Sequence, residues 1–286
     1  MIRRGGSRRY SSLFATPALV AAVFVLASVA LSWGDSGHRL IVSKAVDTLP
    51  DEMRPYFEAI KQYLMLRVTE PSQAALTSVV ERQNQFIHLD HYGNFPFTAL
   101  PRDYKTAVST FGKHSLSVQG LLPWQIGVYS QKLTDAFRAH AWDEVRANAA
   151  LLGFYVGEAH DPFKTTINED GKLSLQPGVS VRFDKSLVDR YSQFFYIHPS
   201  AAAYIQDPTD HAFEACMTSH AMLESILLAD RRSRAGLTDY TDEYYDRFYQ
   251  QAGNILAQQI SDSAADVGSY WLTSWTNAGK PTLPSR

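Results

Sequence analysis

Cysteine is almost absent from this chain, which carries a single thiol at Cys216. One cysteine cannot form a disulfide within the chain, so disulfide-stapled folds are excluded. Dense clusters of lysine and arginine are also missing after residue 32, and a protein that grips duplex DNA through its phosphates would show such a cluster. Alternating polar and apolar residues are scarce as well, so the sequence does not predict a β-sheet protein.

The longest apolar run lies near the N-terminus. Four arginines within the first nine residues precede an uncharged stretch over residues 18–31. This stretch is shorter than the roughly 20 residues that cross a bilayer, and Ala30 and Ser32 supply the small side chains that a signal peptidase inspects. We predict a signal peptide over residues 1–32, cleaved before Trp33, and a secreted or periplasmic protein without a stable membrane span. An uncleaved N-terminal anchor is the alternative.

Residues 33–286 are predicted to form one compact, all-α, multi-helix domain. Removal of the signal peptide leaves 23 basic and 29 acidic side chains, enough length for one large core, and no composition break that would mark a linker. Apolar residues recur at helical spacing over most of the chain. The predicted helices cover residues 35–48, 51–66, 81–90, 124–140, 142–160, 186–195, 208–229 and 240–278. Turn residues over 161–181 predict a long loop.

Two motifs carry a family resemblance. Trp33 is followed five residues later by His38, and the segment Leu152–Pro162 reads Leu-Gly-Phe-Tyr-Val-Gly-Glu-Ala-His-Asp-Pro. Together with the short segment around His88 and the segment Gly178–Asp184, they resemble the zinc-dependent phospholipase C and fungal single-strand-specific nuclease superfamily. The resemblance covers nearly the whole mature chain. It implies a helical fold in which the freed amine and carbonyl of the N-terminal tryptophan bind zinc beside a histidine.

The chain departs from this family at several ligand positions. The resemblance implies histidines where this sequence has Phe154, Lys164 and Ser180. Phenyl and hydroxymethyl groups are poor zinc ligands, and an ammonium repels a cation. The family's early aspartate has no counterpart either, because no aspartate lies between Asp51 and Asp90. We therefore describe the chain as a degenerate member, in which a three-zinc cluster is not expected.

The candidate ligands that remain predict at most one zinc ion. Trp33, His38 and the bridging carboxylate Glu158, with His88 from the neighbouring position, offer four nitrogen and oxygen donors, which suffice for one tetrahedral zinc. Asp184 is the remaining carboxylate of a second position. Lys164 is predicted to contact a substrate phosphate, and a solvated loop lysine is its alternative. His91, His160, His211, Cys216 and His220 are interpreted as ordinary structural side chains.

Two functions follow from the resemblance. The first is an exported zinc-dependent phosphodiester hydrolase of the nuclease or phospholipase C type, acting on nucleic acid or phospholipid with one zinc that lowers the pKa of a bound water. The second is a catalytically inactive relative that serves as an extracytoplasmic binding or structural module. A third interpretation, which does not need the resemblance, is a metal-free helical interaction protein in which Trp33 and His38 merely pack. Metal content separates this third interpretation from the other two, and turnover of a generic phosphodiester with added zinc separates the first from the second.

Overall fold

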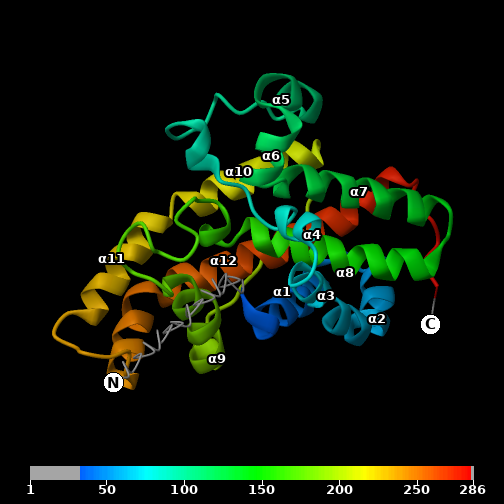
Figure 1. The fold of residues 1–286 in the computed structure, drawn as a ribbon. Coiled ribbons are helices and arrows are strands. Elements are labelled where there is room, and N and C mark those ends of the chain that lie inside the picture. Colours follow the sequence, from blue (N-terminus) through cyan, green and yellow to red (C-terminus); the bar gives the residue numbers. More distant parts are fainter. Residues whose placement is uncertain (1–32, 285–286) are drawn as a thin grey trace, which may run out of the picture.

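The computed structural model describes residues 33–284. Within this range the chain is built from helices and loops without a β-strand, which confirms the predicted single all-α domain (Figure 1). The predicted signal peptide lies outside the described residues. No helix of residues 33–284 is long and apolar enough to cross a bilayer.

Most helices follow one another with short connections, and longer non-helical segments cover residues 93–103, 165–180 and 195–207. Their bounds are α1 Gly34–Thr48, α2 Arg54–Arg67, α3 Glu70–Ala75, α4 Val79–Gln83, η1 Leu89–Tyr92, α5 Tyr104–Phe111, α6 Lys113–Gln119, α7 Leu122–Arg138, α8 Trp142–Ala159, η2 Pro162–Lys164, η3 Val181–Ser186, α9 Leu187–Tyr191, η4 Ser192–Phe194, α10 Pro208–His220, α11 Leu223–Arg234 and α12 Asp242–Asn277.

Helix α12 is the central element of the fold. It is 36 residues long and contacts α1, α7, α8 and α11 (Figure 1). Apolar residues at helical spacing form its fully buried stripe, namely Leu256, Ile260, Ala264, Val267 and Trp271. Gly268 allows α1 to approach closely, because a Cβ there would lie 1.9 Å from Thr48 Oγ1. Burial of this stripe supplies much of the driving force for folding.

Hydroxyl groups on α12 hold the extended segment that precedes α10. Ser269 Oγ accepts a hydrogen bond from Ala203 N at 3.0 Å, and Thr273 Oγ1 accepts one from Ile205 N at 2.8 Å. These serine and threonine side chains satisfy backbone groups that have no partner in a helix or sheet. The segment is thereby fixed along α12 without secondary structure of its own.

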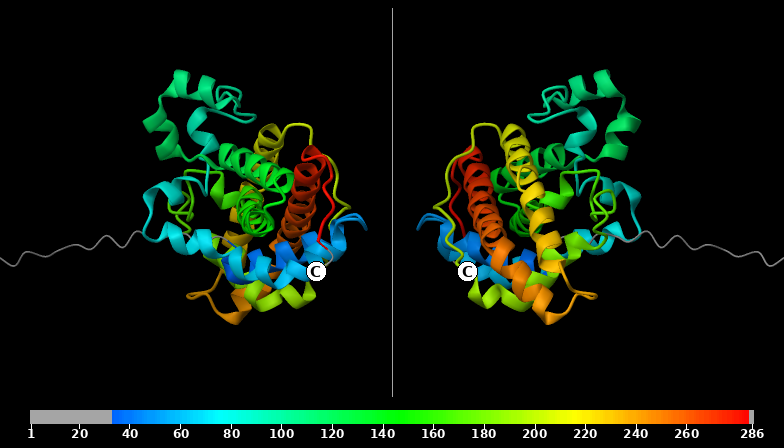
Figure 2. Two further views of the ribbon diagram at one scale, coloured as in Figure 1. Left: turned by 90° about the vertical axis from the view of Figure 1, so that its right-hand side faces the viewer. Right: turned by 90° about the vertical axis from the view of Figure 1, so that its left-hand side faces the viewer.

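Helices α7, α8, α10 and α12 form the body of the molecule, and α5 and α6 project from it at one end (Figure 2). Helix α8 contacts α1, α2, α7, α10 and α12, so its residues are buried on most sides. The last turn of α8 holds Glu158 and therefore brings a carboxylate into the interior.

Two of the predicted helices differ from the structure. Over residues 81–90 only the short α4 and η1 are helical, because the chain between them pairs with other segments: Ile87 N donates to Lys164 O at 2.8 Å and His88 N donates to Gln119 O at 2.7 Å. The predicted helix over 208–229 is split at residues 221–222 into α10 and α11. Helices α5 and α6 were not predicted, since their short apolar pattern resembles a loop.

A network of two histidines and one aspartate joins three parts of the fold. Asp266 of α12 accepts hydrogen bonds from His160 Nε2, just after α8, and from His211 Nε2 of α10, both at 2.9 Å. Burial would raise the pKa of Asp266, but the two histidines lower it below its usual value. The bond to Asp266 raises the pKa of His211. The raised pKa of His211 favours its protonated form, which pairs with the carboxylate of Asp266.

We predict that His211→Gln destabilises the protein most at low pH. A histidine whose pKa is raised by folding stabilises the fold fully below its unfolded pKa and loses this contribution as the pH rises through its folded pKa. Since the side chain is 37% exposed, the effect should not exceed about 1 kcal/mol. Melting curves at about pH 5.5 and about pH 8.5 should show the difference from wild type shrinking at the higher pH. A pH-independent difference, or an equal effect of substituting the exposed His114 by glutamine, would contradict this.

Candidate functional site

Trp33 is fully buried at the start of α1. Its indole Nε1 donates a hydrogen bond to Gly157 O of α8 at 2.8 Å, and its own carbonyl accepts one from Gly37 N at 3.2 Å. The first bond ties the beginning of α1 to the last turn of α8, next to Glu158. Tryptophan suits this position because its large ring fills the core while its one polar atom finds a partner.

His38 and Glu158 form a buried pair one turn further along α1. His38 Nε2 lies 2.9 Å from Glu158 Oε1, and the two side chains are 1% and 0% exposed. Gly157 makes room for the imidazole, since a Cβ there would lie 3.1 Å from His38 Nδ1. The predicted ligands Trp33, His38 and Glu158 therefore lie together, and their role in binding metal stays a prediction.

Phe154 occupies the helical position one turn before Glu158. Its ring centre lies 4.6 Å from that of His38, with the planes tilted by 31°. The family resemblance implies an imidazole at this position, and the phenyl ring packs against the one that remains. This face of α8 therefore offers a hydrophobic contact in place of a metal donor.

Lys164 contacts the other carboxylate oxygen of Glu158. Its Nζ lies 3.3 Å from Glu158 Oε2, and the side chain is only 13% exposed. Burial by itself would lower the pKa of Lys164, but the charges of Glu158, Asp161 and Asp184 raise it above its usual value. The ammonium therefore keeps its proton. The two oxygens of Glu158 thus lie next to an imidazole and an ammonium, respectively.

Asp161 and Asp184 complete a group of three buried carboxyl groups around Lys164. Both aspartates are at most 1% exposed. Asp161 Oδ1 accepts a hydrogen bond from Phe163 N at 2.9 Å, which caps η2. Burial raises the pKa of Asp161 to about 7, and the charge of Glu158 adds to this shift. Burial and the charge of Asp161 raise the pKa of Asp184 well above its usual value.

His88 points to a different pair of partners. Its Nε2 lies 2.6 Å from Glu169 Oε1 and its Nδ1 lies 2.9 Å from Gln119 Oε1. Both neighbouring atoms are oxygens, so the doubly protonated, cationic imidazole can donate to both of them. Burial would lower the pKa of His88, but the bonds to Glu169 and Gln119 raise it. In this state His88 has no lone pair to offer to a metal.

This arrangement of side chains does not fit a zinc ion. Zinc needs unprotonated nitrogen and carboxylate donors directed at one point. Here Glu158 is engaged by His38 and Lys164, and both ring nitrogens of His88 are engaged by Gln119 and Glu169. In residues 33–284 no group of three or more histidine, cysteine, aspartate or glutamate side chains is arranged to hold a metal ion. The charged Lys164 also adds repulsion for any cation.

Two residues of this cluster were not singled out from the sequence. Asp161 lies three residues after Glu158, a spacing that places side chains on the same side of a helix turn, so this signal was available. Glu169 lies in the loop after η2, and nothing in the local sequence indicates that it meets His88 across 81 residues.

Three further histidines have structural partners, and the thiol is buried. His160 and His211 bind Asp266, and His220 Nδ1 donates to Thr165 O at 3.1 Å. Cys216 is fully buried, and burial raises the pKa of its thiol. The resemblance implies a histidine at the position of Ser180. The hydroxyl of Ser180 donates a hydrogen bond to Asp170 Oδ1 at 3.4 Å.

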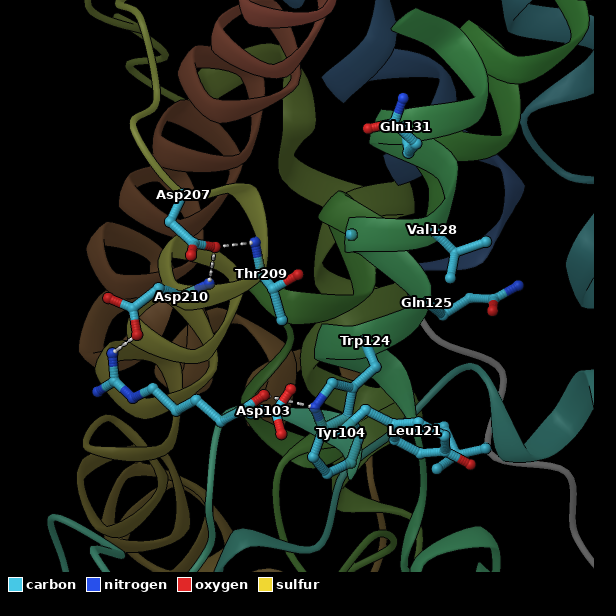
Figure 3. A pocket seen from close by; sticks show the side chains of 12 residues that line it. Asp103, Tyr104, Leu121, Trp124, Gln125, Val128, Gln131, Asp207, Thr209 and Asp210 are labelled. Atoms are coloured by element: carbon cyan, nitrogen blue, oxygen red, sulfur yellow. Dashed lines mark hydrogen bonds and ion pairs between the residues drawn. The ribbon is translucent and has the colours of Figure 1, made fainter. Parts of the chain in front are cut away.

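A separate pocket lies between α7, α10 and the segment before α5 (Figure 3). Its volume is about 690 Å³. It is lined by aromatic, aliphatic and polar residues: Arg102, Asp103, Tyr104, Leu121, Trp124, Gln125, Gly127, Val128, Gln131, Asp207, Thr209 and Asp210. Trp124 is fixed in this wall by a bond from its Nε1 to Arg102 O at 2.7 Å, and its ring meets that of Tyr104 edge to face.

The charged groups of this pocket are paired with one another or cap helices. Arg102 binds both Asp210 and Glu214. Asp103 Oδ1 caps α5 through Thr106 N, and Asp207 Oδ1 caps α10 through Thr209 N and Asp210 N (Figure 3). Apolar faces and polar side chains such as Gln125 and Thr209 line the rest of the pocket.

No protein-family model matches this sequence, and no curated protein matches it. Its fold is similar to two solved structures. The alpha-toxin of Clostridium perfringens from the avian strain SWCP has a TM-score of 0.53 and 16% identity, over 87% of this chain and 65% of the toxin. The alpha toxin from Clostridium absonum has a TM-score of 0.50 and 14% identity, over 85% of this chain and 64% of that one. The chain thus spans just under two thirds of the toxins' length. It has a phospholipase C-like helical fold.

Proposed function

We propose that this chain is an exported protein with a phospholipase C-like fold that serves as a binding module outside the cytoplasm and does not hydrolyse phosphodiesters. One observation carries the proposal: the carboxylate of Glu158, which the resemblance makes the bridging zinc ligand, lies 2.9 Å from His38 Nε2 and 3.3 Å from Lys164 Nζ. Clustered metals hydrolyse phosphodiesters by activating a bound water and by clamping the attacking and leaving oxygens. These side chains do not supply the metal ligands that either of these two tasks requires.

Export is proposed from the sequence of residues 1–32. Arginines, an uncharged apolar stretch and small residues before Trp33 are typical of a cleaved signal peptide. The single, buried thiol of Cys216 is compatible with an oxidising compartment because it is shielded from reaction.

The pocket between α7 and α10 is the proposed ligand site. Trp124, Tyr104, Leu121 and Val128 supply aromatic and aliphatic surface, and Gln125 supplies hydrogen-bonding groups. Small-molecule sites commonly combine such an apolar wall with a few polar groups. The carboxylates at the rim outnumber Arg102, which disfavours an anionic ligand such as a phosphate ester. We propose an uncharged ligand with a flat or aliphatic face.

A single-zinc hydrolase acting on nucleic acid or phospholipid is the second candidate. It is favoured by the proximity of Trp33, His38 and Glu158, three residues that the resemblance assigns to one zinc position. In that case the zinc would lower the pKa of a bound water, and Lys164 would contact a substrate phosphate. Zinc would first have to replace the contact between His38 and Glu158 and to overcome the charge of Lys164.

The two candidates predict different metal contents. We expect protein purified without chelator to contain far less than one zinc per chain, with the same low content in His38→Ala. Bis-p-nitrophenyl phosphate with added zinc should be hydrolysed no faster than in buffer. Near-stoichiometric zinc that is lost on His38→Ala, together with turnover, would establish the hydrolase instead. Elemental analysis and a colorimetric assay provide both measurements.

Export predicts a defined N-terminus. Protein expressed from the full sequence and recovered from outside the cytoplasm should begin at Trp33 by intact-mass and terminal-peptide analysis. Recovery of the unprocessed chain in the membrane fraction would show that residues 1–32 are an anchor.

The pocket predicts binding of an uncharged apolar probe. N-phenyl-1-naphthylamine should bind with a rise in fluorescence, and Val128→Arg should weaken binding by at least about tenfold by filling the pocket with a charged side chain. Val80→Arg is the matched control, because Val80 is also exposed but lies on α4, away from the pocket. Equal effects of the two substitutions, or no binding by wild type, would remove the pocket from the proposal.

A further inference from the structure

Three carboxyl groups are enclosed in the core where α8, η2 and η3 meet. Glu158, Asp161 and Asp184 are each at most 1% exposed. Charged carboxylates lose their hydration on burial, and several close together also repel one another. A cation placed among these carboxyl groups would offset both costs.

Lys164 is placed to be that cation. It lies in η2, six residues after Glu158, and its Nζ is 3.3 Å from Glu158 Oε2. The charges of Glu158, Asp161, Asp184 and, more weakly, Glu169 all act on this one ammonium. A solvated loop lysine would be largely exposed, whereas the side chain of Lys164 is 13% exposed.

The backbone holds this lysine in place. The carbonyl of Lys164 accepts a hydrogen bond from Ile87 N at 2.8 Å, and the carbonyl of Thr165 accepts one from Leu89 N at 3.0 Å. Pro162 at the start of η2 and the Asp161 cap fix the turn that precedes it. The side chain therefore leaves a fixed backbone and enters the carboxyl cluster directly.

From this geometry we infer that the ammonium of Lys164 is a built-in structural cation, which balances the buried carboxyl cluster and makes the fold independent of bound metal. The inference deepens the proposed function and rests on it, because it explains how a fold with the carboxylates of a metal site is stable without the metal. It assigns Lys164 to stability and not to a substrate phosphate.

The test compares thermal unfolding of wild type, Lys164→Met and Lys172→Met, each with EDTA and with added zinc. Methionine keeps the length of the side chain and removes its charge. Lys172, in the loop that follows η2, is the matched control. Its side chain is 63% exposed and its Nζ lies 3.8 Å from Asp170 Oδ2, so it forms an ion pair at the surface and not in the core. We expect EDTA to leave the wild-type Tm unchanged, Lys164→Met to lower it by roughly 10 °C, and Lys172→Met to have little effect.

Two results would overturn the inference. A marked fall of the wild-type Tm in EDTA would show that a metal ion, and not the lysine, holds the cluster. A Tm of Lys164→Met equal to that of Lys172→Met would show that the ammonium of Lys164 does not stabilise the fold.

A double substitution keeps the test decisive where Lys164→Met does not fold. Removing one carboxylate together with the lysine should restore part of the stability, so Lys164→Met/Glu158→Gln should fold and melt above Lys164→Met, while Glu158→Gln alone melts below wild type. Additive losses would contradict direct coupling of the two charges. Phosphodiester turnover by zinc-loaded wild type would defeat the proposed function, whereas these melting temperatures decide the role of Lys164.

Discussion

The contact between a buried ammonium and a buried carboxylate is the constraint on which this part of the molecule depends. Removing one partner from such a pair leaves an uncompensated charge in a medium of low polarity, which costs more than the pair itself contributes. Glu158, Asp161 and Lys164 therefore have to be considered together. Each is acceptable inside the protein only because the others are present.

The packing of the helices creates this constraint. Helix α8 is packed between α1, α2, α7 and α12, so its last turn has no access to solvent. The indole of Trp33 closes the cluster on one side through Gly157, and Phe154 packs against His38. In a site that recruits a metal the same enclosure would protect the ion. Here it encloses charges that the chain itself supplies.

Much of the fold could be predicted from the sequence, and less of the site. The periodicity over residues 142–160 and 240–278 gave α8 and α12 almost to the residue, because long amphipathic patterns are the strongest local signal. The absence of imidazoles at Phe154, Lys164 and Ser180 was visible as well. The direction of the Lys164 side chain and the meeting of His88 with Glu169 were not, since both depend on contacts between segments far apart in the sequence.

The backbone pairing of residues 87–89 with residues 164–165 gives position 164 an unusual freedom. Both hydrogen bonds use main-chain atoms, so they form with almost any side chain at that position. In the folded protein, these two bonds attach the loop after α8 to residues 87–89 without using the side chain at position 164. During divergence, a single replacement at position 164 could change the charge inside the site while the backbone around it kept its conformation. The identity of this one residue would then determine which charges the core can hold.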